Sequence, residues 1–340
     1  MKKYIENLLL SKDGLFPEKE IVSFKLFGKC VRRLSTVYFL DVSFASNINR
    51  KYCLKSLSDN VVDGKKKIIN EYNSNLFVYE NFEENNVFRI VKPIYVDPQE
   101  KFLITEFFEN GKTIESFLVR NIYFGNFENI RRIIFSCGFF LRKYHGVSVS
   151  VTTFEKKIMQ DLKKYLIVRL EKICTYAENN GFENKFSHKE IERFCLRYDE
   201  LLNGYEPRPE MFSLIHGDFT PANILYDKSS FSLIDFSDSK ISSKYQDIGC
   251  FLNYLRMLSL NKPFISEKKI ELLQLAFLQG YDDTNTEGHK LIKVYQYRYL
   301  LTNLISQINE LQSAPIKSVY LKSRIVKYMN SARNHFKSLN

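Results

Sequence analysis

One short segment constrains this 340-residue chain more than any other. Residues 214–225 read L-I-H-G-D-F-T-P-A-N-I-L, in which His216, Asp218 and Asn223 have the spacing H-x-D-x-x-x-x-N. Twelve positions after Asn223, an apolar, strand-like run leads directly to Asp235. A loop held between two apolar strands would let its polar side chains and the Asp235 carboxylate point into one cleft. The segment therefore predicts a polar cluster on a loop between two strands.

The residue types at these positions suit phosphoryl transfer. In that reaction one carboxylate receives or aligns the acceptor hydroxyl, while an amide oxygen and a second carboxylate hold the metal ions that bridge the nucleotide phosphates. Asp218 precedes Asn223 by five residues, the spacing of a kinase catalytic loop. We therefore predict that Asp218 is catalytic and that Asn223 and Asp235 hold Mg²⁺. We expect His216 to be a buried residue that orients the loop, rather than an acid or base.

Residues 216–247 resemble the aminoglycoside phosphotransferase/choline kinase family, the small-molecule branch of the protein-kinase-like fold. The elements H-G-D-x-x-x-x-N-I-L, I-D-F and D-I/L-G/A of that family all occur here, the last beginning at Asp247. Two other segments are similar to helices of the family: 137–145, which ends in histidine, and 277–281, which ends in Gly-Tyr. The resemblance covers about residues 20–285.

The rest of the chain has the patterns of two different lobes. Short or alternating apolar runs predict strands in the first part, and apolar residues at spacings of three and four predict helices after about residue 113. The predicted strands of the first part are 21–27, 36–44, 51–57, 89–96 and 101–108, with a helix at 65–82. The predicted later helices are 156–177, 191–202, 246–258, 267–280, 291–310 and 317–339, with strands near 213–215 and 232–234.

These patterns and the resemblance predict an α+β, bilobal protein-kinase-like fold, with a small antiparallel sheet in one lobe and mainly helices in the other. We expect a nucleotide-binding lobe at 1–108, a hinge at about 106–112, and a helical lobe at 113–340 that carries the catalytic loop and the acceptor-binding helices. Asp247 is expected to have a structural role, either as a helix N-cap or by tying down the catalytic loop.

The resemblance also implies a strand lysine that grips the nucleotide phosphates and a helix glutamate that orients it. Lys55 is the candidate lysine, because it lies in a short strand with apolar neighbours. Glu71 is the preferred partner on the following helix, and Glu80 is the alternative.

Two departures separate this chain from protein kinases. Only Gly28 occurs between the first two strands, so the glycine-rich loop is missing, and Ser35 is expected to contact a phosphate instead. Asp235 is followed by Phe-Ser-Asp rather than Phe-Gly, without a later A-P-E element, which favours a small acceptor over a peptide. The sequence T-E-F-F resembles the family hinge, where Glu106 and Phe108 would meet the adenine, although the aromatic pair could equally be core.

The distribution of charge bears on the acceptor. The formal net charge is +11, and residues 1–110 contain 17 basic and 15 acidic side chains, whereas 111–340 contain 33 and 24. Residues 211–300 are balanced, with ten of each, and 301–340 hold six basic and one acidic. A basic acceptor lobe does not favour polycationic aminoglycosides. The predicted acceptor is therefore a sugar or a cell-envelope glycan intermediate, with an aminoglycoside or a choline-like alcohol as the alternative.

Together these features predict a cytoplasmic, ATP-dependent phosphotransferase that acts on a hydroxyl of a small molecule. No apolar run reaches the ~18 residues of a membrane helix, and no export signal is expected. No nucleic-acid motif occurs, so we expect no nucleic-acid partner; the basic helix at 317–339 could contact an anionic membrane weakly. A nucleotide-binding pseudokinase scaffold is the non-enzyme alternative. The preference for ATP over GTP and the oligomeric state stay open.

Overall fold

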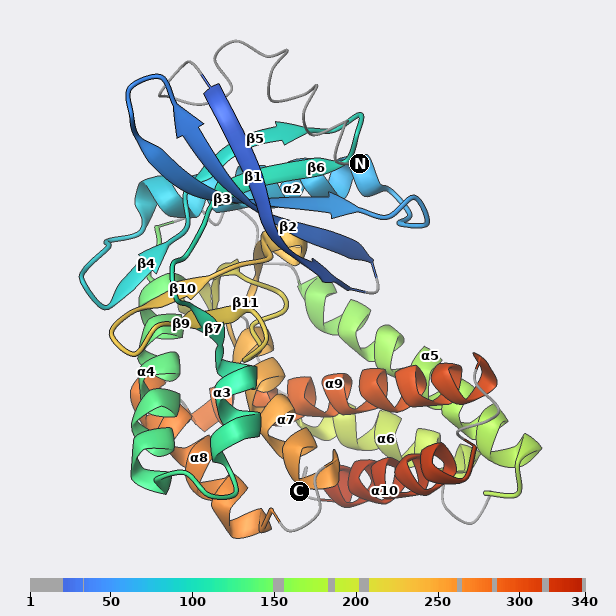
Figure 1. Ribbon diagram of the computed structural model, residues 1–340. Helices are drawn as coiled ribbons and strands as arrows, with labels where there is room; N and C mark the ends of the chain where they lie inside the picture. Colours follow the sequence, from blue (N-terminus) through green and yellow to red (C-terminus); the bar gives the residue numbers. More distant parts are fainter. Residues whose placement is uncertain are drawn as a thin grey trace. The chain divides into compact units, whose positions relative to one another are not determined.

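A computed structural model describes residues 21–32, 34–148, 156–182, 187–201, 208–261, 265–282, 286–313 and 318–337. The chain divides into two compact units, whose elements are labelled in Figure 1. The first consists of Met1–Ser116, His216–Asp218 and Ala222–Lys240, and the second of Phe117–Ile215, Phe219–Pro221 and Ile241–Asn340. Packing rather than sequence order defines these units, so the predicted lobe boundaries at 108 and 113 stay a prediction.

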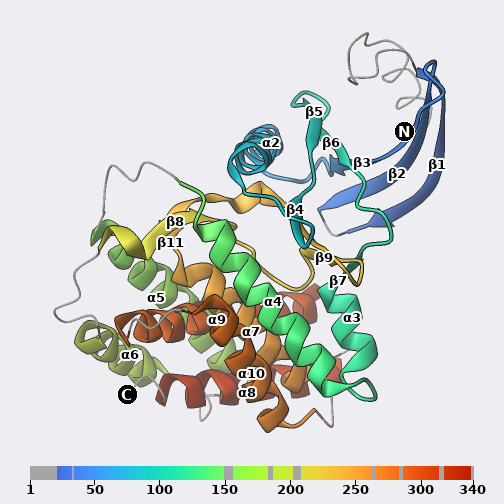
Figure 2. The same ribbon diagram turned by 90° about the vertical axis from the view of Figure 1, so that its left-hand side faces the viewer.

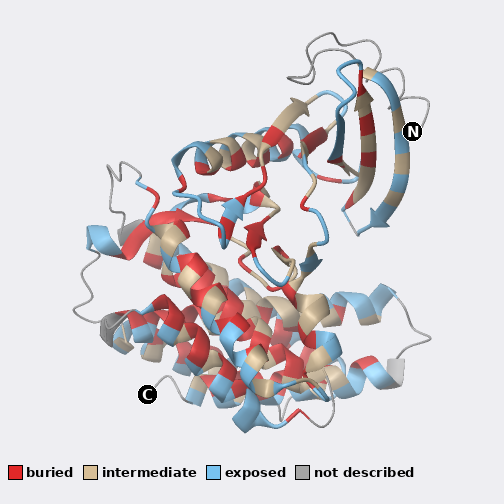
Figure 3. Ribbon diagram, turned by 60° about the vertical axis from the view of Figure 1, so that its left-hand side comes forward, coloured by how far each residue is buried: buried red, intermediate tan, exposed pale blue. Residues whose placement is uncertain are grey.

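The first unit is built on a five-stranded antiparallel sheet in the order β1-β2-β3-β6-β5. Alternate residues of the central strands point to one side and form an apolar core that includes Leu40, Leu54 and Ile104. Along β2 and β3, buried residues (red in Figure 3) alternate with half-buried ones (tan). A helix, α2, packs against β5 and β6. The bounds are β1 (Ile21–Val31), β2 (Ser35–Phe44), β3 (Asn49–Leu57), α2 (Gly64–Asn81), β5 (Pro93–Asp97) and β6 (Phe102–Glu106).

A second sheet of the first unit combines two distant parts of the chain, in the order β4-β10-β9-β7. Strand β10 runs parallel to β4 and antiparallel to β9. The prediction of a single strand at 89–96 was wrong, because Val91 and Lys92 separate β4 from β5 and the two strands join different sheets. A 3₁₀ turn, η2, packs against α2. The bounds are β4 (Phe88–Ile90), β7 (Lys112–Thr113), β9 (Ile224–Tyr226), β10 (Phe231–Leu233) and η2 (Phe236–Asp238).

The second unit is mainly helical, and α7 is its most buried helix, with every residue of 245–253 buried. No helix among the described residues is both long enough and apolar enough to cross a membrane. Residue 202 of the helix predicted at 191–202, and residues 317, 338 and 339 of the helix predicted at 317–339, lie outside the described residues. Helix α3 and strand β11 begin in the first unit and continue into the second. The bounds are α3 (Ile114–Asn121), α4 (Phe127–His145), α5 (Lys156–Asn179), α6 (His188–Leu201), η1 (Pro209–Met211), β8 (Phe212–Ile215), β11 (Lys240–Ser243), α7 (Tyr245–Asn261), α8 (Glu267–Tyr281), α9 (Thr286–Ser313) and α10 (Ser318–Lys337).

Two glycines allow α4 and α8 to pack closely against each other. A Cβ atom on Gly138 would overlap the carbonyl oxygen of Phe277, and one on Gly280 would overlap the carbonyl oxygen of Phe135. The backbones of the two helices therefore meet directly at this crossing, which only glycine permits. The helices lie side by side in Figures 1 and 2. Both glycines belong to the two segments that resemble helices of the phosphotransferase family, so those segments mark a helix crossing.

Candidate active site

Three charged side chains that are far apart in the sequence meet in the first unit. The Nζ atom of Lys55, on β3, donates hydrogen bonds to both carboxylate oxygens of Glu71 at 2.8 Å and to Oδ1 of Asp235 at 2.7 Å. The exposed fractions of these side chains are 16%, 4% and 24%. Burial alone would lower the pKa of Lys55, but the two carboxylates raise it above its ordinary value. Lys55 therefore stays protonated and links β3 to α2 and to the segment after β10.

Glu71 occupies the buried face of α2, together with Ile68, Asn75 and Val78. Burial raises the pKa of its carboxyl, and the positive charge of Lys55 opposes this shift. Glu80, the alternative partner of Lys55, is exposed. The structure pairs the lysine with Glu71.

Asp235 is held in an unusual backbone conformation directly before η2. Its φ angle is 69°, in the left-handed region that non-glycine residues adopt at a cost of about 1–2 kcal/mol. Ser237 donates a hydrogen bond from Oγ to Asp235 Oδ1 at 3.0 Å, and Asn70 donates from Nδ2 to the carbonyl of Ser237 at 3.0 Å. Nη1 of Arg32 lies 4.0 Å from Asp235 Oδ2. None of these three supporting residues was predicted from the sequence.

The charge of Asp235 is stabilised by its partners. Burial alone would raise the pKa of the Asp235 carboxyl, but the charge of Lys55 and the hydrogen bond from it hold this pKa below its ordinary value. A carboxylate that stays ionised beside a lysine is suited to binding a cation or to orienting that lysine.

The loop that carries the H-G-D motif needs glycine at its second position. Gly217 has a φ angle of +83°, and a Cβ atom there would overlap the carbonyl oxygen of Asp238. The buried His216 donates a hydrogen bond from Nε2 to the carbonyl oxygen of Ile234 at 3.0 Å. The loop is thereby fixed to the residue that precedes Asp235 in the chain.

Asn223 orients Asp218 within this loop. Its Nδ2 atom donates hydrogen bonds to Asp218 Oδ2 at 2.9 Å and to the Asp218 carbonyl oxygen at 3.0 Å. Burial raises the pKa of the Asp218 carboxyl, and the negative charge of Asp235 raises it further, while His216 and the hydrogen bond from Asn223 oppose the shift. A fixed carboxylate with a raised pKa is a stronger proton acceptor than an ordinary aspartate, which is what a general base requires.

The oxygen atoms of Asn223 and Asp235 fit a cation such as Mg²⁺. Proteins commonly bind Mg²⁺ through one or two carboxylates together with substrate phosphates and water. Lys55 uses Oδ1 of Asp235, so Oδ2 and the Asn223 amide oxygen would be the protein ligands. Among the described residues, no three His, Cys, Asp or Glu side chains form a complete metal site. The donor set suits a cation whose other ligands come from a nucleotide.

The other three predicted nucleotide-binding residues form no hydrogen bond or ion pair with Lys55, Glu71 or Asp235 in the part of the chain that the structure describes. Ser35 begins β2 and is buried, and in the described part of the chain no hydrogen bond joins it to Lys55 or Asp235. Glu106 ends β6, where its backbone N–H donates to the carbonyl of Lys92 at 2.9 Å. Phe108 is buried. Their roles toward a nucleotide stay predictions.

The buried ring of Phe108 packs against a basic side chain of β4. The guanidinium of Arg89 lies 4.6 Å from the centroid of this ring. Phe108 is only 5% exposed, and this burial favours its interpretation as part of the core, which the sequence left open.

Asp247 belongs to the second unit, where it joins three helices. It is the third residue of α7 rather than its N-cap, and it is fully buried. Its Oδ2 atom is 3.1 Å from Nε2 of His145, whose Nδ1 atom is 2.8 Å from the hydroxyl of Tyr281. His145 ends α4 and Tyr281 ends α8, so this network connects the ends of the two helices that cross at glycines.

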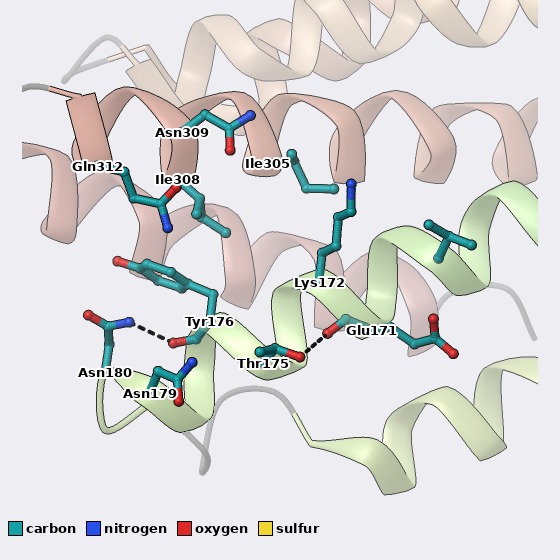
Figure 4. Close-up of a pocket in the computed structure, with 11 residues that line it drawn as sticks. Glu171, Lys172, Thr175, Tyr176, Asn179, Asn180, Ile305, Ile308, Asn309 and Gln312 are labelled. Carbon is teal, nitrogen blue, oxygen red and sulfur yellow. Dashed lines mark hydrogen bonds between the residues drawn. The ribbon is translucent and has the colours of Figure 1, made fainter.

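The second unit also contains a cavity of about 550 Å³ between α5 and α9, shown in Figure 4. Tyr176 and Ile308 lie on facing helices there, and the amides of Asn180 and Gln312 gather at the same end. Asn180 donates a hydrogen bond to the carbonyl of Tyr176 at 2.8 Å. No predicted site residue lines this cavity.

Comparisons with known proteins agree with this fold. The phosphotransferase enzyme family matches residues 108–283, just over half of the chain, whereas no curated protein sequence matches it. Among solved structures, the ADP-bound aminoglycoside phosphotransferase APH(2'')-Ib is similar with a TM-score of 0.55 at 14% identity, over 99% of both chains. A choline kinase from Cryptosporidium parvum has a TM-score of 0.55 at 14% identity, over 98% of this chain and 95% of that one.

A choline/ethanolamine kinase family protein from Mesorhizobium loti is also similar, with a TM-score of 0.53 at 13% identity, over 98% of this chain and 99% of that one. At sequence identities this low, the similarity shows only that the folds are alike. The α+β, protein-kinase-like fold predicted from the sequence is confirmed, with an antiparallel sheet in the N-terminal part and helices in most of the rest.

Proposed function

Because this chain belongs to the phosphotransferase enzyme family, we propose that it is a small-molecule kinase that transfers the γ-phosphoryl group of ATP to a hydroxyl group. The observation that carries the proposal is the set of contacts of Lys55 with Glu71 and Asp235 at 2.7–2.8 Å. An ordered lysine beside an ionised aspartate supports the binding of nucleotide phosphates and their cation. The ADP-bound state of a similar phosphotransferase supports an adenine nucleotide as donor.

Each polar residue of the cluster has a role in this proposal. Lys55, oriented by Glu71, binds the phosphates, and Asp218 aligns the acceptor hydroxyl and takes its proton. Asn223 and Asp235 would hold Mg²⁺, which supplies neutralisation of phosphate charge when it is bound. The hydrogen bonds from Asn223 to Asp218 support this assignment, because they fix the carboxylate of the base.

The acceptor is the less constrained part of the proposal. We propose a sugar or a cell-envelope glycan intermediate, which the basic excess of residues 111–340 supports. The names of the similar structures make aminoglycosides and choline-like alcohols the alternatives to test. Purified protein with ATP and Mg²⁺ should phosphorylate at least one compound in a panel of sugars, glycan fragments, aminoglycosides, choline and ethanolamine. Phosphorus NMR detects the new phosphate ester directly.

Asp218→Asn tests the mechanism once an acceptor is found. Loss of the proton acceptor should reduce kcat by about 10²–10⁴-fold, while the dissociation constant for ATP changes little. Asp59→Asn is a matched control, because Asp59 belongs to the same unit and its side chain is 99% exposed. Undiminished turnover in Asp218→Asn would refute the role of Asp218. Nucleotide binding without transfer to any compound of the panel would favour the pseudokinase scaffold.

A further inference from the structure

A cavity of about 500 Å³ lies within the second unit, and none of the residues assigned to phosphoryl transfer lines it. The residues that line it belong to α7, α8, α9 and α10. Helix α7 contacts each of the other three helices, whose arrangement can be followed in Figures 1 and 2. The lining includes the basic side chains of Arg256, Lys293 and Lys327 and the acidic side chains of Glu267 and Glu271. Its volume is typical of pockets that bind small molecules.

Arg256 brings a positive charge into this cavity without a paired carboxylate. Its Nη1 atom donates a hydrogen bond to Nδ1 of His335 at 2.6 Å, and it forms no ion pair with any carboxylate of the described residues. Burial lowers the pKa of the guanidinium, and the negative charge of Glu267 opposes this shift. Partial burial of an unpaired charge is unfavourable, so an anion bound here would be stabilised.

His335 fixes the orientation of Arg256. Its Nε2 atom donates a hydrogen bond to the carbonyl oxygen of Lys293 at 2.8 Å, so Nδ1 is the acceptor for Arg256 and the ring is neutral. Burial lowers the pKa of His335 to about 4, and the ring stacks on Tyr297 with centroids 6.0 Å apart. The imidazole therefore holds the guanidinium in place without compensating its charge.

Ser331 provides a second, independent indication of a ligand. It lies one turn before His335 on α10, lines the cavity and is only 7% exposed, yet its Oγ atom has no hydrogen-bond partner in the described part of the chain. Lys327 lies one turn earlier and lines the same cavity. The spacing of four residues places all three side chains on one face of the helix. A buried hydroxyl without a partner is unfavourable unless a ligand satisfies it.

We propose that this cavity binds the phosphate group of a small phosphomonoester, held by Arg256, Ser331 and Lys327. A guanidinium, a hydroxyl and an ammonium group together suit a tetrahedral dianion with several acceptor oxygens. The carboxylate of Glu271 and the amide of Gln274 on α8 face hydroxyl or ammonium groups of the rest of the ligand. The carboxylates of Glu267 and Glu271 disfavour a polyphosphate, because they would repel its additional negative charges. The site does not depend on the proposed function, because none of its residues belongs to the catalytic cluster.

Calorimetric titration of the full-length protein tests this site. The probes are glucose 6-phosphate, glycerol 3-phosphate and phosphoethanolamine, each compared with glucose and with inorganic phosphate. At least one phosphomonoester should bind saturably and more tightly than both reference compounds. Failure of all three to bind, or equal binding of inorganic phosphate, would overturn the proposal.

Two variants connect this binding to the cavity. Ser331→Ala removes a buried hydroxyl that has no partner, so it should not lower the melting temperature, while it should weaken binding of the phosphomonoester about tenfold. Lys327→Met should also weaken binding, whereas Lys322→Met, an exposed control on the same helix that does not line the cavity, should not. Affinity that is unchanged in both Ser331→Ala and Lys327→Met would show that the ligand binds elsewhere and would refute the proposal.

Discussion

The link between Lys55 and Glu71 makes a sharp prediction about stability. Lys55→Met would keep most of the apolar stem of the side chain but leave Glu71 and Asp235 as neighbouring carboxylates without a cation. Glu71 is 4% exposed, so water cannot replace the lost partner there. Glu71→Gln keeps the shape of its side chain but removes its charge. Each variant therefore removes one of the two charges of the Lys55–Glu71 pair.

The geometry sets the size of the effect. Two unit charges 2.8 Å apart attract by about 6 kcal/mol at an effective dielectric constant of about 20, and desolvation offsets a large part of this. Removal of one partner of a buried pair typically costs about 3–5 kcal/mol. Because Asp235 is 24% exposed and can regain some hydration, we expect Lys55→Met to lower the free energy of unfolding by about 3 kcal/mol.

Urea unfolding of the two single variants and the double variant, at mildly alkaline pH, measures the coupling between the charges. The double variant should be about 2 kcal/mol more stable than the sum of the single effects predicts, because Glu71→Gln removes a charge that Lys55→Met leaves unpaired. Lys51→Met is the control: Lys51 lies on the same strand and pairs with Glu109, but the two side chains are 41% and 62% exposed. That change should cost less than about 0.5 kcal/mol. The reasoning fails if Lys55→Met costs no more than Lys51→Met, or if the two single effects simply add.

Substitutions at three glycines give further predictions that urea unfolding can check. Gly217→Ala should lower the free energy of unfolding by about 3 kcal/mol, because alanine disfavours the positive φ angle and its methyl group would overlap the Asp238 carbonyl. Gly181 has a similar φ angle of 72° but open space around it, so Gly181→Ala should lower the free energy of unfolding by only about 1–2 kcal/mol. Gly138→Ala should lower the free energy of unfolding by about 3 kcal/mol, because α4 would have to move away from Phe277 on α8. Equal losses of stability in Gly217→Ala and Gly181→Ala would contradict the close approach of Gly217 to Asp238. An unchanged stability of Gly138→Ala would contradict the close approach of Gly138 to Phe277.

The parts of the fold that depend on local patterns were predicted well from the sequence. The strands of the first sheet and the long helices have enough residues for an apolar period to be recognised. The strand near 232–234 was predicted and corresponds to β10, but the second sheet to which it belongs was missed, because its strands are two or three residues long and β4 pairs with β10 far later in the chain. Pairing over such a distance leaves no local signal, so residues 89–96 were interpreted as one strand.

The candidate site also contains residues that a local sequence pattern identifies and residues that no such pattern identifies. The spacing of Asp218, Asn223 and Asp235 predicted that they share a site, and the structure brings them together with Lys55 in the first unit, while their catalytic and metal-binding roles stay predictions. Arg32 lies near the Asp235 carboxylate, but it belongs to the loop between β1 and β2, where no pattern distinguishes one basic residue from the next. Asn70, whose amide binds the turn after Asp235, could not be predicted either, because its position on a helix does not distinguish it from other polar residues.

The choice between Glu71 and Glu80 was open in the sequence, yet helix geometry contains the signal that decides it. The two residues are nine positions apart, which at about 100° per residue places them on opposite faces of α2. The apolar residues Ile68 and Val78 define the buried face, and Glu71 lies on that face. A carboxylate on a buried face needs a cationic partner, and Lys55 on the preceding strand is such a cation. The glutamate that conflicts with the apolar pattern is therefore the one to pair with the lysine, whereas Glu80 fits the pattern as an ordinary surface residue.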